Sequence, residues 1–197
     1  MKKWLIPLIL IGVLFFAVFG WAKGFYNTAV KLEEPTKEAW AKVESAYQRR
    51  NDLIGNLVKT VQGAADFERG TLTDVIEARS KATQINVDPA NVQQLAEFQQ
   101  AQTGLSSALS RLLVTVERYP NLKANQNFLE LQAQLEGTEN RINVARDRFY
   151  ETIRPYNEHI KTYPNTILAG YFNLEELAYY QADAGAENAP EVDFNFE

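Results

Sequence analysis

The chain has 197 residues, of which 20 are basic and 25 acidic, with a formal net charge of −5 and no cysteine. The lack of cysteine excludes disulfides, thiolate nucleophiles, cysteine metal sites and a lipid anchor on cysteine. When Lys2, Lys3 and Lys23 are set aside, 17 basic residues remain against 25 acidic ones, a net charge of −8. This charge argues against nucleic acid and anionic lipid head groups as general partners, because both attract basic surfaces.

The first predicted element is a membrane anchor. Residues 4–22 form an uncharged, apolar run between lysines, and as a helix they reach about 28 Å, close to the hydrocarbon thickness of a bilayer. A cleaved signal peptide, which the small residues Gly20 and Ala22 would allow, usually has a shorter apolar run of ~7 to 15 residues. We therefore expect an uncleaved transmembrane anchor over residues 1–23 that contacts membrane lipid through residues 4–22.

The distribution of lysines gives little indication of the orientation of this anchor, because lysines flank the apolar run on both sides. Two lysines before a single apolar run are the usual form of a signal anchor whose carboxyl side is exported. We expect a single-pass protein of the cell (inner) membrane, with a cytoplasmic N-terminus and a C-terminal domain that is periplasmic or extracellular.

After the anchor, apolar residues recur in steps of three and four, which is the spacing of amphipathic helices, and strand patterns are absent. Turn and capping residues predict four helices: one that ends near Gly63, one over Thr71–Ile85, one from the Asp88-Pro89 cap to Tyr119, and one over Leu122–Tyr163. The first of them contains Pro35, which predicts a bend or a break. The expected inward positions are Tyr26, Ala29, Glu33, Thr36, Trp40, Val43, Tyr47, Arg50, Ile54, Leu57, Val61 and Ala64; Leu72, Val75, Ile76 and Ala82; Leu95, Phe98, Gln102, Leu105, Leu109, Leu112, Val116 and Tyr119; and Phe128, Leu131, Leu135, Thr138, Ile142, Ala145, Phe149, Thr152, Tyr156, His159 and Tyr163.

These elements predict an all-α fold. An N-terminal transmembrane helix is followed, over residues 24–180, by an elongated antiparallel up-down helical bundle of the four-helix type, with three long helices plus one shorter. The first and last helices of the bundle reach roughly 60 Å, so they should form a stalk between the four-helix region and the bilayer. Residues 181–197 carry five acids and no base, which predicts a flexible tail. Its alternating residues 192–196 could instead add as a strand to a partner.

Arg50 occupies an apolar seam, where a guanidinium needs a partner or a route to water. If the first and last helices are antiparallel with Tyr26 level with Tyr163, the numbers of facing residues add to 189, and Arg50 faces Glu139. We predict an Arg50–Glu139 contact that fixes the register of the bundle. The alternative is that Arg50 extends to solvent.

The residue pattern does not predict catalysis. His159 is the single histidine and lies on the last seam without a convincing Ser/Asp arrangement, so we expect a packed or hydrogen-bonded histidine. Di-iron bundles need Glu-x-x-His motifs on two helices, whereas Tyr156 stands three residues before His159. We predict no catalytic, cofactor-binding or metal-ligating residues and no cofactor.

The two ends of the bundle invite further interpretations. At the distal tip, residues 119–125 are rich in turn residues; Asn121 is expected to cap the last helix, and the tip could also dock a partner. After Pro164, Asn173 is expected to cap a turn that runs to Tyr180. Aromatic residues collect at the membrane-proximal end and predict a membrane-facing collar, although some must be core: Phe25, Tyr26, Phe149, Tyr150, Tyr156, Tyr163, Tyr171, Phe172, Tyr179 and Tyr180.

Several motifs resemble the LemA family: RRNDLIGNLV at 49–58, ERYPNLKAN at 117–125, TENRI at 138–142, and PEVDF at 190–194. The resemblance extends over almost everything from Tyr26 onwards. It implies a bacterial single-pass membrane protein with a helical bundle outside the cytoplasm and no established enzymatic activity. Through a relative implicated in shaping membranes, it also suggests a role in membrane organisation.

Two classes of function follow. The favoured one is a non-enzymatic, membrane-anchored scaffold or interaction protein of the bacterial cell envelope, acting through a protein partner or self-association and not on nucleic acid. The alternative is an accessory subunit of an envelope protease, or a cryptic hydrolase that depends on carboxylates such as Glu117 and Glu139.

Overall fold

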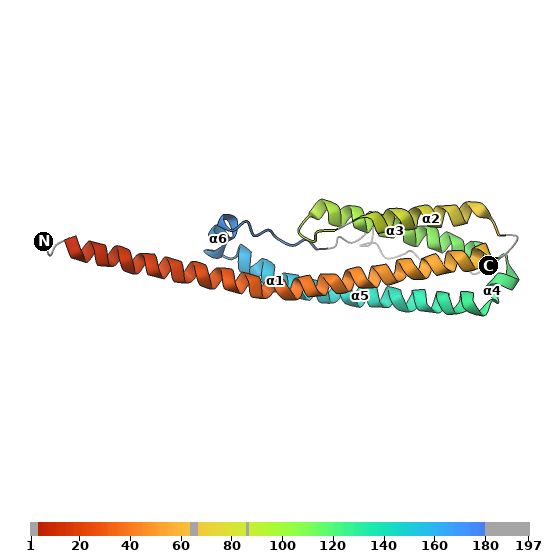
Figure 1. Cartoon of the computed structure of the whole chain (residues 1–197), viewed down its shortest axis with the longest axis horizontal. Coiled ribbons are helices and arrows are strands. Elements are labelled where there is room, and N and C mark those ends of the chain that lie inside the picture. The colour runs from red at the N-terminus through yellow and green to blue at the C-terminus, as the bar shows by residue number, and fades with distance from the viewer. Residues whose placement is uncertain (1–3, 64–66, 86, 180–197) are drawn as a thin grey trace, which may run out of the picture.

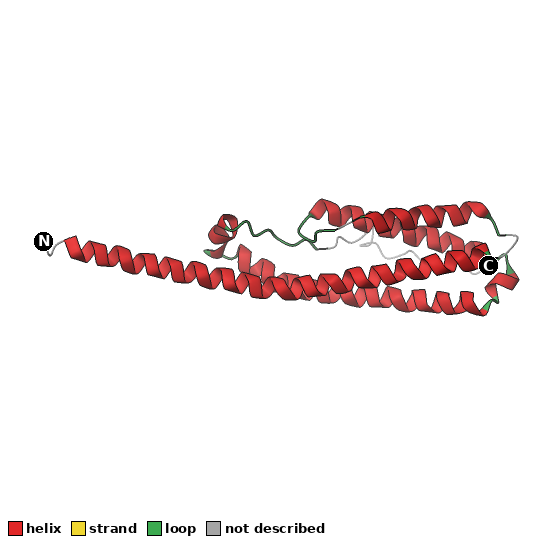
Figure 2. Ribbon diagram, viewed as in Figure 1, coloured by secondary structure: helices red, strands yellow, loops and turns green. Residues whose placement is uncertain are grey.

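The computed structural model describes residues 4–63, 67–85 and 87–179 of the chain. These residues form helices and no strand (Figure 2), which confirms the all-α prediction. The helices in chain order are α1 (Leu5–Gln62), α2 (Arg69–Gln84), α3 (Val92–Val116), α4 (Pro120–Lys123), α5 (Gln126–Lys161) and α6 (Asn165–Tyr171).

The apolar N-terminal run and the first bundle helix are one continuous helix, α1, of 58 residues. Pro35 lies inside it, so a break at this residue is wrong; α1 instead curves gently along its length (Figure 1). Proline removes one backbone hydrogen-bond donor, but the neighbouring turn of α1 is held by contacts of Thr36 within α1 and with α5. The hydroxyl of Thr36 lies 3.1 Å from the Leu32 carbonyl oxygen and 3.3 Å from that of Thr152 on α5.

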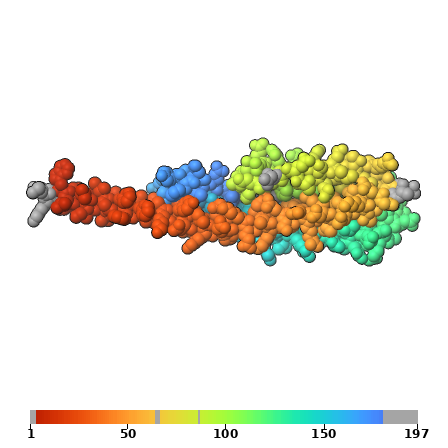
Figure 3. All heavy atoms as spheres, viewed as in Figure 1, coloured from red at the N-terminus to blue at the C-terminus, as the bar shows by residue number. Residues whose placement is uncertain are grey.

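The bundle is built from two antiparallel pairs, α1 with α5 and α2 with α3 (Figure 1). The α2–α3 pair covers only the half of α1 and α5 that is distal to the N-terminus, and the molecule is a long rod (Figure 3). This is the predicted four-helix region with a stalk. Its distal core contains Ile54, Leu57, Val61, Val75, Leu105, Leu112 and Phe128, and its proximal core contains Trp40, Val43, Phe98, Phe149 and Ile153.

The distal turn differs from the prediction. Pro120–Lys123 forms the separate short helix α4, and α5 begins at Gln126 instead of Leu122. The capping residue of α5 is Asn125, whose side-chain oxygen accepts a hydrogen bond from the Phe128 amide at 3.2 Å. Asn121 therefore does not cap this helix, because it lies one turn earlier, inside α4.

Some predicted inward positions are wrong. Ile76 is 44% exposed and Tyr26 is also 44% exposed. At the proximal end of α5 the buried residues are Ile153, Tyr156, Asn157 and Ile160, so the buried face shifts by about one residue from the predicted seam. The helix ends at Lys161, and Tyr163 beyond it is 78% exposed. Ala64 lies outside the described residues.

After a cis Tyr163–Pro164 peptide, α6 folds back against the bundle and leads to an extended segment over 174–179. Asn173 has a φ of 51° and ends α6 in the left-handed conformation. It does not cap a following turn, which corrects the prediction, since an asparagine tolerates positive φ where a helix terminates. The tail predicted over 181–197 lies outside the described residues.

Candidate functional site

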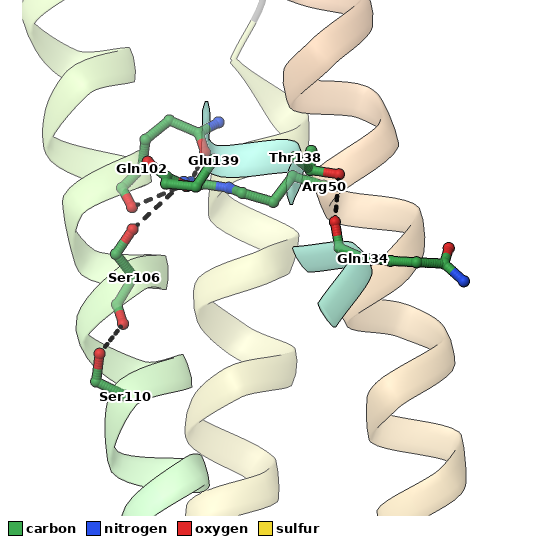
Figure 4. Close-up of polar contacts among 7 residues, drawn as sticks. All are labelled: Arg50, Gln102, Ser106, Ser110, Gln134, Thr138 and Glu139. Carbon is green, nitrogen blue, oxygen red and sulfur yellow. Dashed lines mark hydrogen bonds and ion pairs between the residues drawn. The ribbon is translucent and has the colours of Figure 1, made fainter. Parts of the chain in front are cut away.

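A connected polar group lies between α1, α3 and α5. It is the Arg50 cluster, in which Arg50 contacts Gln102, Ser106 and Glu139 (Figure 4) and also the ring of Tyr47. Arg50 is only 4% exposed, and its Nη1 donates to Glu139 Oε2 at 3.0 Å. The predicted Arg50–Glu139 contact is therefore confirmed, and the alternative in which Arg50 extends to solvent is wrong.

The Arg50 cluster joins three helices. Nη2 of Arg50 donates to the side-chain oxygen of Gln102 on α3, and Nη1 lies 3.4 Å from Ser106 Oγ. The guanidinium also lies 5.2 Å from the centre of the Tyr47 ring, in cation–π geometry. Sequence reasoning placed Gln102 on an apolar seam but did not pair it with Arg50, although two polar residues in facing seams are the signal that could have done so.

The chemistry of this cluster is that of a structural ion pair. A guanidinium stays protonated and cannot take a proton from Ser106, so the two do not form a nucleophile–base pair. Glu139 is half exposed, at 53%, and one of its oxygens is occupied by Arg50. Arg50 Nε and Gln102 Nε2 have no hydrogen-bond partner among the described residues, which makes the cluster sensitive to further loss of acceptors.

The two carboxylates of the hydrolase alternative are not brought together. Glu117 follows α3 at the distal tip and pairs with Lys123 of α4. Glu139 lies 13 residues into α5, which is about 20 Å from the same tip along the helix. Paired carboxylates that cleave a bond across a substrate lie roughly 5 to 9.5 Å apart. The arrangement of Glu117 and Glu139 therefore does not support a joint catalytic role.

His159 is packed against α1 at the membrane-proximal end of the bundle. Its Nε2 lies 3.1 Å from the carbonyl oxygen of Phe25, and its ring stacks on the Phe25 ring with centroids 4.9 Å apart. These contacts agree with the packed, hydrogen-bonded histidine that the sequence predicts. Across the described ranges there is no group of three or more histidine, aspartate or glutamate side chains that could hold a metal ion.

Sequence reasoning missed a backbone clamp made by Asn157. This side chain is 4% exposed and forms two hydrogen bonds with Leu177, donating to its carbonyl at 2.9 Å and accepting from its amide at 3.0 Å. One residue later, the Ala178 amide donates to the Pro89 carbonyl at 3.2 Å. The extended segment is thus fixed both to α5 and to the loop before α3.

The predicted aromatic collar divides into a core and a surface. Phe25, Phe149 and Tyr156 are buried, and burial raises the pKa of the Tyr156 hydroxyl above its ordinary value. Tyr163 and Tyr171 are exposed by 78% and 79%. Only the exposed members could meet a membrane surface. Tyr180 lies outside the described residues.

An open groove runs between α1 and α5 and carries mixed charge. Its charged lining residues are Glu38, Lys42, Arg141, Arg148 and Glu151. Within it, Lys42 donates to Glu38 at 2.7 Å, and this hydrogen bond lowers the pKa of the Glu38 carboxyl. A groove of this kind is a solvated surface with small side chains between opposite charges, and it holds no concentration of one charge that would select a charged ligand.

The sequence of this chain is similar to those of known proteins. A family model described as the LemA family matches residues 39–194. The Magnetosome protein MamQ 2 of Paramagnetospirillum magneticum is 25% identical over 175 residues, covering 79% of this chain and 64% of that protein. Protein LemA of Metamycoplasma hominis is 25% identical over 182 residues, covering 89% of this chain and 75% of that protein. The chain thus spans slightly less than two thirds of the length of MamQ 2.

Proposed function

The chain belongs to the LemA family, and from this premise we propose that it is a non-enzymatic, membrane-anchored scaffold or interaction protein of the bacterial cell envelope. In this proposal residues 4–22 cross the cell membrane once, with the N-terminus in the cytoplasm and the bundle on the exported side. The protein then organises membrane components through a protein partner or a second copy. The observation that carries the proposal is the continuity of α1 from its apolar segment into the bundle core.

The exposure of the apolar segment of α1, up to residue 22, supports a membrane location. By length and composition, α1 is the one helix in the described part of the chain that could cross a membrane. Large apolar side chains are exposed along this segment, from Trp4 at 85% to Phe19 at 59%. A contiguous apolar surface of this size is unfavourable in water and is expected to be covered by lipid or protein.

The shape of the bundle supports a spacer or scaffold role. From Phe25, the first buried residue, to Gln62 the helix rises about 56 Å. Arg50 ties this length of α1 to α3 and α5. The Asn157 clamp ties α5, through the segment over 174–179, to the loop before α3. The length of an anchored rod of this kind would set how far from the bilayer its distal tip can reach. The surface at the tip is then available to a partner.

In-cell photo-crosslinking with mass spectrometry on the full-length protein tests the proposal. Photo-reactive residues are placed at Asn121 on the distal tip, at Tyr150 near the proximal core, and at Phe194 in the tail, with exposed Arg154 as a control position. Discrete protein or self-crosslinks at Asn121 or Phe194 that are absent at Arg154 support the proposal. A crosslink to an envelope protease would assign the accessory-subunit alternative. A monomer that forms no specific crosslinks would contradict an interaction role.

A further inference from the structure

A stretch of the chain without any charge lies where the bundle approaches the anchor. From Thr162 to Leu174 the sequence contains no acidic or basic residue and includes the aromatic residues Tyr163, Tyr171 and Phe172. The stretch forms the cis-proline turn and α6. Charged residues are frequent elsewhere in the domain, so this uncharged stretch is unusual within it.

Helix α6 is amphipathic, and one of its faces is unpartnered. Ala169 is 6% exposed, and Leu168 and Phe172 pack against the proximal core. Ile167 and Tyr171, one helical turn apart, are 59% and 79% exposed. Residues four apart lie on the same face of a helix. The outward face of α6 therefore presents an apolar and an aromatic side chain together.

The level of α6 along α1 follows from its ring contacts. The Phe172 ring lies 6.3 Å from the Phe25 ring and 5.1 Å from the Tyr26 ring, measured between centroids. Figure 1 shows α6 at the end of the bundle nearest the N-terminal part of α1. Phe25 is three residues beyond the apolar run, which is about 5 Å along the helix. The head-group region of a bilayer extends about 5 to 7 Å beyond the hydrocarbon on each side. In a bilayer that residues 4–22 of α1 span, the carboxyl end of α6 at Phe172 would therefore lie at head-group depth.

We propose that α6 is a second membrane contact, in which Tyr163, Ile167 and Tyr171 enter the head-group region of the leaflet from which α1 emerges. This inference rests on the proposed function, because it assumes that α1 spans the bilayer. Tyrosine favours this region, since its ring is apolar and its hydroxyl can reach water or a head group.

The partner is a lipid surface recognised through apolar and aromatic contact. The uncharged stretch offers no cation for phosphate, and the ammonium of the neighbouring Lys161 is engaged at 2.8 Å by Glu176. The contact between α6 and lipid should therefore form on neutral phosphatidylcholine and be insensitive to salt. The overall negative charge of the domain is consistent with this mode, because it disfavours electrostatic attraction to anionic lipid.

A second membrane contact would restrict how the bundle moves relative to the bilayer. A single helix leaves the bundle free to rotate about the helix axis and to tilt. Helix α6 packs beside α1 and α5 and lies off the axis of α1 (Figure 1). Attachment at both places would fix the rotation of the rod and hence the direction in which the groove between α1 and α5 faces.

The absence of cysteine allows a direct test with single-cysteine variants of the full-length protein. Ile167→Cys and Tyr171→Cys are labelled with the environment-sensitive fluorophore NBD in phosphatidylcholine liposomes that contain nitroxide lipids, quenching either near the head group or deep in the chains. Val13→Cys reports the span. Val114→Cys is a matched control, because Val114 is an exposed apolar residue, at 72%, on the distal part of α3.

We expect labels at Ile167 and Tyr171 to be quenched more by the shallow than by the deep nitroxide, and Val114 by neither. Tyr163→Ser with Tyr171→Ser should reduce shallow quenching of the label at Ile167 while leaving the helix content unchanged. If Val13 is quenched by the deep nitroxide but both α6 labels behave like Val114, the second contact is overturned and the span stands. If Val13 is not quenched, the span and the inference that rests on it both fail.

Discussion

The Arg50 cluster allows a double-mutant cycle whose outcome follows from its contacts. Arg50→Met keeps the length of the side chain but removes the guanidinium. Glu139 is 53% exposed and can return to water, so its lost partner costs little. Gln102 is 4% exposed and loses its partner, and an unsatisfied buried polar group costs roughly 1 to 3 kcal/mol. We expect Arg50→Met to lower the free energy of unfolding by about 2 kcal/mol.

The reciprocal change should cost a similar amount. Gln102→Leu removes the acceptor of Nη2 and leaves the buried guanidinium with Glu139, Ser106 and a 3.4 Å contact to the backbone carbonyl of residue 102. The loss should be about 2 kcal/mol, since a charged donor is left less satisfied. The double variant replaces both polar groups with apolar ones of similar size and should lose only about 1 kcal/mol. The coupling free energy is then about 3 kcal/mol.

Urea unfolding of the full-length protein in detergent micelles, followed by far-ultraviolet circular dichroism, measures all four corners of the cycle. Arg49→Met is the matched control, because Arg49 is exposed beside Arg50 and should change stability by less than about 0.5 kcal/mol. Additive losses in the double variant would show that Arg50 and Gln102 are not coupled. So would an Arg50→Met variant that is as stable as Arg49→Met.

Three further predictions test other parts of the structure. Asn125→Ala should lower the free energy of unfolding by about 1 kcal/mol, and Asn121→Ala by less, because only Asn125 caps α5. Asn157→Ala should accelerate hydrogen exchange at the Leu177 amide, because that amide loses its buried acceptor. Burial raises the pKa of Tyr156, so its stabilising effect is complete below the unfolded pKa of about 10 and is lost as pH rises through the folded value. As the pH rises above about 10, urea midpoints should fall less in Tyr156→Phe than in the parent protein.

Each of these predictions has a clear contrary result. Equal losses at Asn125 and Asn121 would mean that the distal turn is built differently. Unchanged exchange at Leu177 would mean that Asn157 does not hold the extended segment. Identical pH profiles for Tyr156→Phe and the parent protein would mean that another group controls stability in alkali.

The four main helices of the bundle were predictable because the spacing of their apolar residues indicates them. The register of α1 against α5 followed once one pair of facing residues was assumed. Two antiparallel α-helices have the same rise per residue, so one correctly placed pair of facing residues determines the other facing pairs. The assumed sum of 189 placed Arg50 opposite Glu139 correctly, although Tyr163, which was used to set it, lies beyond the end of α5. The contact between Thr36 and Thr152, whose numbers add to 188, shows that the same register continues toward the membrane end.

Features that depend on competition between similar residues were not predictable. Asn121 and Asn125 are both good capping residues, and only the packing of Leu122 into the distal core, which makes α4 a separate helix, decides between them. Pro35 is a helix breaker in local terms, yet the packing of α1 on α5 overrides it. The Asn157 clamp joins α5 to an extended segment 20 residues later, and such a segment has no helical periodicity by which to place it.

The proposed function requires that α1 crosses the membrane and presents the bundle on its exported side. Single-cysteine variants at Val13 and Asn121, treated with a membrane-impermeant maleimide in spheroplasts, test it most directly. We expect labelling at Asn121 in intact spheroplasts, and no labelling at Val13 until detergent is added. Labelling at Val13 without detergent would contradict the span, and labelling at Asn121 only after lysis would contradict the orientation.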